Sequence, residues 1–159
     1  MNGFNISEAG HVVPVVLPKN VTGGATGQAF SMKSAEHASI VISVGALAAQ
    51  LGAVTLNQCT NVSGSGATAI PFRYYQQSTA GAGNDTFDTG PVAATSAGFT
   101  PPNTPNVVYV IEIDSAELAD GSPYLQLAIA NGANADFASV VAILSGQRQQ
   151  YRGNPSATV

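Results

Sequence analysis

Two histidines are the first residues of this chain that could do chemistry. His11 and His37 have no cysteine or second histidine at the spacing of zinc ligands, so the sequence argues against a zinc site. His37 follows Glu36 directly before an apolar run, and we interpret it as a polar residue at the start of a strand. We therefore predict no metal site.

The single cysteine, Cys59, could act as a nucleophile only beside a histidine that activates its thiol. It ends an alternating segment that is typical of a strand, so we favour a small buried thiol. With one cysteine, no disulfide can form within the chain.

Four carboxylates gather at Glu112, Asp114, Glu117 and Asp120. On a strand, Glu112 and Asp114 share one face and could pair or bind a hard cation. The segment lacks the ligand density of a calcium loop, so we favour a solvated face or one that meets Arg or Lys of a neighbouring chain. A hydrolase that uses Glu112, Asp114 or His37 is the enzymatic alternative, and we expect instead that the chain is not an enzyme.

The glycine-rich segments 63–66 and 81–83 are not followed by a lysine and match neither a P-loop nor a dinucleotide-binding fingerprint. We interpret both as flexible loops and predict no cofactor.

The chain is poor in charge. Five basic and nine acidic residues make up 9% of its 159 residues, against about 25% in typical soluble domains. A subunit that hides much of its surface in an assembly needs fewer charges, because charged residues are depleted at interface cores. The alternative is a monomer kept soluble by Ser, Thr and Asn, and we favour the assembly.

The charge distribution and the apolar segments limit the partners. The net charge is −4, and the five basic residues form no stripe that could neutralise phosphates, so we expect no nucleic-acid binding. Residues 1–10 lack the basic and apolar regions of a signal peptide, and no stretch approaches the ~18 apolar residues of a membrane span. We expect assembly in a cytoplasm, without a membrane partner.

The element pattern is that of short strands. Gly, Pro, Ser, Thr and Asn interrupt the chain, and the apolar runs between them are rich in β-branched residues. Pro14 interrupts the run His11–Leu17, which is therefore an edge strand or an extended arm. The other strands are expected at Ala29–Met32, Ala38–Val44, Val54–Cys59, Ala69–Gln76, Val107–Asp114, Tyr124–Ala130 and Phe137–Ser145, with a short one within Gly90–Ala94. A helical turn is expected at Ser115–Asp120, whereas Ala46–Leu51 is ambiguous between a helical turn and a loop.

About seven or eight strands at roughly 8–15-residue spacing predict an all-β fold, a β-sandwich or jelly roll with long loops. We expect residues 1–18 to form an N-terminal extended arm, residues 19–147 the sandwich domain, and residues 148–159 a C-terminal tail.

The arm is the first candidate for contact with other subunits. It contains Phe4, Ile6, Val12 and Val13, and a proline-bounded apolar arm can add to the sheet edge of a neighbour. The alternative is an edge strand of the chain's own fold.

Two further segments are interface candidates. Arg73 and Tyr75 point outward on their expected strand, and Tyr and Arg are enriched at interface hot spots. The tail contains Arg148, Tyr151 and Arg152, which either dock on an acidic partner or remain solvated.

Seven segments resemble those of small proteins encoded among the head genes of tailed bacteriophages: GHVV (10–13), TGG (22–24), FSMK (30–33), ASI (38–40), AIPF (69–72), YVIEID (109–114) and AILSG (142–146). The resemblance spans nearly the whole chain and includes no catalytic signature. It implies a virion structural protein of the capsid decoration, or cement, type. Such proteins are often β-rich and often trimeric, so the implied partners are the major capsid protein and further copies of this chain.

Two hypotheses for a structural role follow. The first is a decoration protein that binds major capsid protein subunits and stabilises the capsid, located on the surface of a virion assembled in the host cytoplasm. The second is a neck, tail or fibre component that binds host glycans through its Ser, Thr and Asn loops. Imaging the position of the chain on the particle separates the two.

Overall fold

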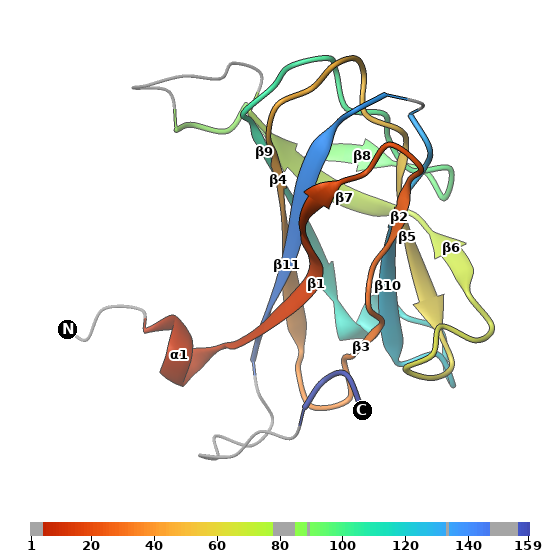
Figure 1. Cartoon of the computed structure of the whole chain (residues 1–159). Coiled ribbons are helices and arrows are strands. Elements are labelled where there is room, and N and C mark those ends of the chain that lie inside the picture. Colours follow the sequence, from red (N-terminus) through yellow and green to blue (C-terminus); the bar gives the residue numbers. More distant parts are fainter. Residues whose placement is uncertain (1–4, 78–84, 89, 133, 147–155) are drawn as a thin grey trace.

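The computed structural model describes residues 5–77, 85–88, 90–132, 134–146 and 156–159. Two antiparallel sheets pack face to face, so the predicted all-β sandwich is confirmed (Figure 1). In the described part of the chain, no helix is long and apolar enough to cross a membrane.

The larger sheet has six strands in the order β1-β11-β4-β9-β7-β8. Every neighbouring pair in it is antiparallel. The strands are β1 (His11–Asn20), β4 (His37–Val44), β7 (Phe72–Gln76), β8 (Val92–Ala94), β9 (Val108–Asp114) and β11 (Phe137–Ser145). A single helical turn, α1 (Ile6–Ala9), precedes β1 and stands away from the sandwich in Figure 1.

The smaller sheet has the order β2-β10-β5-β6, and β3 pairs with another part of β10. Its strands are β2 (Ala25–Thr26), β3 (Phe30–Ser31), β5 (Val54–Cys59), β6 (Thr68–Ile70) and β10 (Tyr124–Ile129). A short 3-10 helix, η1 (Ser115–Glu117), follows β9 and begins with a capping box between Asp114 and Glu117.

Alternation of side chains explains why these segments form strands. In β4, Ile40 and Ile42 point into the core, whereas Ser39 and Val41 point outward. The inward residues of both sheets form one hydrophobic core. At one end of it the Tyr74 ring stacks on Phe99, with centroids 3.9 Å apart and 13° between the planes.

The strand expected over Ala69–Gln76 is wrong in one respect, because the structure divides it into β6 and β7. Pro71 lies between them and has no N–H to donate to a ladder. At this residue the chain crosses from the smaller sheet, where β6 pairs with β5, to the larger sheet, where β7 pairs with β9. This division is one reason why the described residues form eleven strands, whereas seven or eight were expected.

The remaining expectations differ in outcome. A short strand does lie within Gly90–Ala94, as β8, and a helical turn follows β9. Residues 46–51 contain no helix. His11–Asn20 is an edge strand of the larger sheet, one of the two alternatives that Pro14 left open.

Candidate functional site

The side of the larger sheet that faces away from the core, called here the outer face, contains a continuous row of apolar side chains. Pro14, Val141, Val41, Val110 and Tyr75 lie directly opposite one another in register, on β1, β11, β4, β9 and β7. Each of them is exposed or half-buried. We call this set the apolar row. Outward positions on a solvated sheet are usually polar, so an apolar row across five strands favours contact with another protein.

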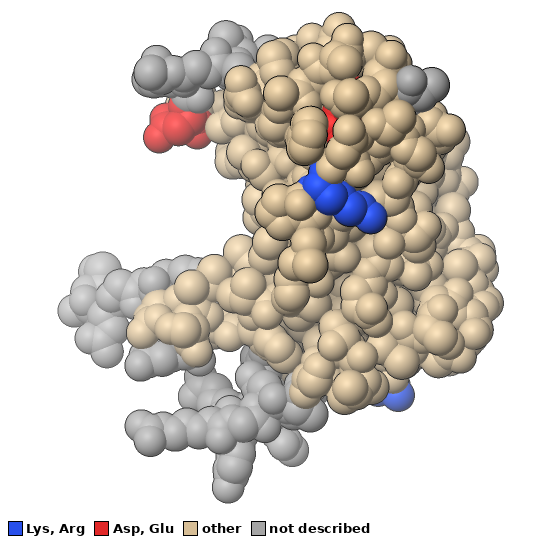
Figure 2. Space-filling view, viewed as in Figure 1, with Lys and Arg blue, Asp and Glu red and all other residues tan. Residues whose placement is uncertain are grey.

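The apolar row is extended at both ends. Beyond Tyr75, the Phe87 ring meets the tyrosine edge-on at a centroid distance of 6.1 Å and is itself exposed. Beside Pro14, Val12 is 46% exposed and lies opposite Ile143. Figure 2 shows a hollow on the left of the molecule, the side on which Figure 1 draws β4 and β9.

The next row on the outer face is partly charged. Val12, Ile143, Ser39, Glu112 and Arg73 lie in register across the same five strands. Arg73 and Tyr75 thus share the outer face, the orientation expected from their strand pattern. Val12 and Arg73, two of the interface candidates, stand at opposite ends of this row.

His37 lies above this row, between two carboxylates of β9. Its Nδ1 is 2.6 Å from Asp114 Oδ1, and its Nε2 is 2.6 Å from Glu112 Oε2. The Ser39 hydroxyl donates to the same Glu112 oxygen at 2.7 Å. Strand register produces this arrangement, because His37 lies directly opposite Asp114 and Ser39 directly opposite Glu112. We call the contact of His37 with the two carboxylates the His37 clamp.

The electrostatics of the clamp favour the imidazolium form. Partial burial by itself lowers the pKa of His37, but hydrogen bonds to Asp114 and Glu112, together with their negative charges, outweigh burial and raise the pKa above its usual 6.5. Both ring nitrogens can donate only when the ring is protonated, and both face a carboxylate. The geometry and the charges therefore agree.

The same geometry bears on the hydrolase alternative. Ser39 Oγ is 3.5 Å from His37 Nε2, and His37 Nδ1 faces Asp114, which is the order of groups in a serine hydrolase. Glu112 however lies closer to Nε2 and accepts the serine hydroxyl, so the ring nitrogen that would take the serine proton is engaged with a carboxylate. The cluster suits charge neutralisation better than general-base catalysis.

Cys59 is a buried thiol, as predicted. It is fully buried and free, and burial raises the pKa of its thiol. It belongs to β5 of the smaller sheet, whereas both histidines belong to the larger sheet. Within the described residues, no group of three or more His, Cys, Asp or Glu side chains could hold a metal ion.

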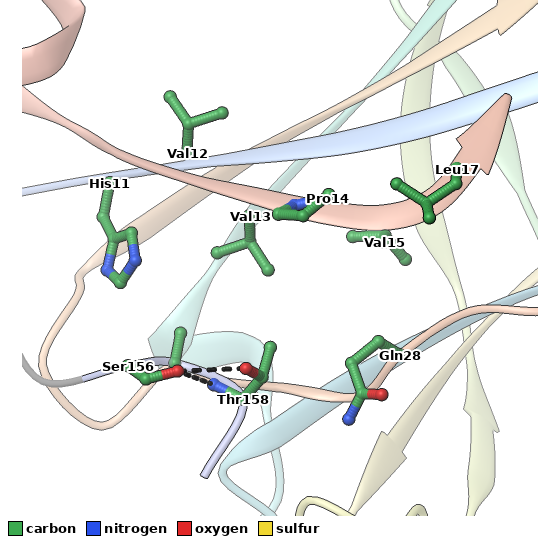
Figure 3. Close-up of a pocket in the computed structure, with 10 residues that line it drawn as sticks. His11, Val12, Val13, Pro14, Val15, Leu17, Gln28, Ser156 and Thr158 are labelled. Atoms are coloured by element: carbon green, nitrogen blue, oxygen red, sulfur yellow. Dashed lines mark hydrogen bonds between the residues drawn. The ribbon is translucent and has the colours of Figure 1, made fainter.

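A second surface feature lies beside β1, where a groove of about 500 Å³ runs between this strand and the C-terminal segment (Figure 3). Ala157 anchors that segment, because its carbonyl accepts a hydrogen bond from the Ser31 amide at 2.7 Å. In Figure 3, Val13 points towards Ser156 and Thr158, whereas Val12 points to the opposite side. Val13 is only 2% exposed and is part of the core, which corrects its place among the surface candidates.

The free edge of β1 is poorly suited to adding a strand from a neighbour. Pro14 and Pro18 lack amide donors, and the ladder with β11 is irregular between Pro14 and Val16 and again between Val16 and Lys19. The Val15 carbonyl already accepts a hydrogen bond from the Gln28 amide at 2.9 Å. These features favour the outer face over the β1 edge as a contact surface.

The predicted interface residues fall into three groups. Val12, Arg73 and Tyr75 all lie on the outer face, with Val12 on β1 and the other two at the opposite end of the row, on β7. Ile6 is exposed on α1. Val13 is in the core. The rest lie outside the described residues, namely Phe4, Arg148, Tyr151 and Arg152.

Sequence reasoning missed the middle of the apolar row, Val41, Val110 and Val141. Each of them alternates with a core residue, so its outward direction was readable. Three valines on the outward side of three strands were the signal, but their alignment in one row depends on strand order and register.

No protein-family model matches this sequence, and no curated protein is significantly similar to it. Among solved structures, the crystal structure of SPBc2 prophage-derived protein YomS is similar to this chain, with a TM-score of 0.49 and 12% sequence identity. The match covers 85% of this chain and 93% of that chain. At this TM-score and identity, the likeness supports no inference about what this chain does.

Proposed function

We propose that this chain is a structural protein of a bacteriophage virion that decorates the capsid and stabilises it by binding major capsid protein subunits. The observation behind the proposal is the apolar row, which crosses five strands of the outer face from Pro14 to Tyr75. The resemblance of seven segments to small phage head proteins points in the same direction.

The scarcity of charge supports burial of this surface in an assembly. Fourteen ionisable Asp, Glu, Lys and Arg side chains share an accessible surface of 8315 Å², so an interface of standard size, about 800 Å² per partner, would include only one or two of them on average. Apart from Arg73 and the His37 clamp beside the apolar row, few charges would then have to lose their hydration on binding, which is a main cost of burying a polar surface. Few charged side chains are visible in the view of Figure 2, which faces the β1 side of the sandwich.

Stabilisation by a small subunit does not require a tight single contact. Many copies bound across a lattice each stabilise the state to which they bind, and copies that also associate with one another add an effective-concentration advantage. We therefore include self-association in the proposal. No catalytic step is part of it.

Binding to capsids tests the proposal. Capsids of the phage that encodes this chain, prepared without it, are incubated with the purified protein, and co-sedimentation and thermal disruption are measured. We expect the protein to sediment with the capsids and to raise their disruption temperature. A protein that binds no virion component would contradict the proposal, and binding to a neck, tail or fibre would replace it by the second structural hypothesis.

A pair of matched variants tests the surface itself. Val110→Asp places a carboxylate in the apolar row, whereas Val62→Asp makes the same change at a half-buried valine in the loop after β5, on the smaller sheet. We expect the Val110 variant to lose at least tenfold in affinity for capsids, about 1.4 kcal/mol or more, and the Val62 variant to bind normally. Equal binding by both variants would exclude the outer face as the docking surface.

A further inference from the structure

The His37 clamp lies beside the apolar row, so a partner that covers the row also reaches the clamp. Val110 and Glu112 are successive outward residues of β9, and successive outward side chains on one strand stand about 7 Å apart. The clamp residues are still accessible, with side-chain exposures of 33% for His37, 34% for Glu112 and 64% for Asp114. A docked partner would therefore remove water from these three ionisable groups together.

We propose that docking through the outer face is linked to protonation of His37. In its imidazolium form, His37 compensates the negative charges of Glu112 and Asp114, so that a partner can bury these two carboxylates. This inference rests on the proposed function, because it concerns the regulation of the same face. It also stands on geometry, since each ring nitrogen lies 2.6 Å from a carboxylate oxygen.

The groups around His37 are mainly carboxylates, so their negative charges favour a proton on its ring. Besides Glu112 and Asp114 on β9, the described residues near the clamp include Glu36, which precedes β4, and Glu117 of η1, which bonds the Asp114 amide. On the other side, β11 presents Ser145 and Ile143, which carry no charge. Arg73 on β7 is a cation of the outer face and lies directly opposite Glu112.

Loss of the proton would change the clamp in two ways. A neutral imidazole has one N–H, so one of the two contacts would bring a ring lone pair against a carboxylate. The pair Glu112 and Asp114 would then have two negative charges without the cation between them. Burying carboxylates without a compensating cation is costly, so the partner would bind the deprotonated form more weakly.

The direction of the effect follows from this difference. A partner that prefers the protonated clamp binds tightly at pH values below the pKa of His37 in the free protein, and its affinity falls as pH rises through that pKa. For one linked proton the fall approaches tenfold per pH unit above the pKa of the free protein, until the pKa of the complex is reached.

Capsid binding measured from pH 5.5 to 9 tests the inference. For the wild-type protein we expect the dissociation constant to rise with pH. His37→Gln keeps a polar side chain without a titrating ring, and its binding should be independent of pH in this range and weaker than that of the wild type at pH 5.5. Nuclear magnetic resonance of the His37 ring in the free protein gives the pKa at which the wild-type rise should begin.

Two isosteric changes provide the second variant and its control. Glu112→Gln removes one of the two carboxylate charges and should retain more binding at pH 9 than the wild type. Asp120→Asn removes a charge from an exposed position after η1, and it should follow the wild-type profile. Circular dichroism establishes that each variant is folded.

The outcomes separate the two proposals. Wild-type binding that is equally tight from pH 5.5 to 9, or a His37→Gln profile identical to that of the wild type, would overturn proton linkage and leave the docking function in place. Failure of the wild type to bind any virion component at any pH would overturn the docking function and the linkage with it.

Discussion

The Asp136 carboxylate accepts hydrogen bonds from the backbone amides of Ala48 at 2.9 Å and Ala49 at 3.3 Å. Asp136 is 1% exposed, and it tethers the segment between β4 and β5 to the residue that precedes β11. Because this segment is not helical, its amides have no helical carbonyl to donate to, and the Asp136 oxygen is their acceptor instead.

Replacing Asp136 with Ala should therefore destabilise the protein. Loss of the acceptor leaves two partly buried amides without this partner, and hydrogen bonds to a charged group contribute about 1.5–3 kcal/mol. We expect urea denaturation to show a free energy of unfolding lower by about 2–4 kcal/mol. Asp136→Asn retains an acceptor oxygen and should lose clearly less; equal losses would show that the hydrogen bonds are not the cause.

Gly98 is required where β5 meets the segment before Pro101. Its φ is +79°, and an added Cβ would lie 2.0 Å from the Val54 carbonyl oxygen. Gly98→Ala should break the backbone hydrogen bonds between Val54 and Phe99 and loosen the stacking of Phe99 on Tyr74. We expect the free energy of unfolding to fall by about 2–4 kcal/mol. Gly90 has a similar φ of +74° with no neighbouring atom within 4 Å, so Gly90→Ala should cost only about 1–2 kcal/mol of strain. Similar melting temperatures for the two variants would rule out the clash.

Tyr109 is a fully buried residue whose hydroxyl has no hydrogen-bond partner among the described residues. Burial, with smaller contributions from Tyr74 and Asp88, raises the pKa of Tyr109 to about 12, so the hydroxyl stays neutral. Because an unpaired buried hydroxyl costs about 1–3 kcal/mol, Tyr109→Phe should raise the free energy of unfolding by about 1 kcal/mol. Tyr75→Phe, at a half-buried ring on the outer face, should change it by less than about 0.5 kcal/mol. A destabilised Tyr109 variant would indicate that the hydroxyl has a partner after all.

The sequence predicted best those features that depend on a single strand. The alternation in Ala38–Val44 and Val107–Asp114 identified β4 and β9 and the direction of their side chains. It did not predict that the chain changes sheets at Pro71, because a proline between the apolar residues Ile70 and Phe72 is compatible with one bent strand. The ambiguity over residues 46–51 has a similar origin, since the Asp136 contact that holds this loop lies 88 residues away in the chain.

The candidate site was predicted only in parts. Arg73 and Tyr75 were expected to point outward together, and the sequence placed His37 at the start of a strand. That His37 lies between Glu112 and Asp114 depends on the pairing of β4 with β9, and neither strand specifies its neighbour. The apolar row depends on the order of five strands, which alternation within each strand cannot reveal.

The His37 clamp should also make the stability of the isolated protein depend on pH. The pKa of His37 is raised in the folded state above its usual 6.5, so the folded protein binds the proton more tightly than the unfolded chain does. The stabilisation is fully present below about pH 6.5 and is lost as pH rises through the pKa of the folded state. Urea denaturation of the wild type and of His37→Gln at a series of pH values isolates this contribution. We expect the difference in unfolding free energy, wild type minus variant, to be largest near pH 5.5 and to shrink towards pH 9. A difference that stays constant, or that grows with pH, would mean that the two carboxylates do not hold the proton on His37.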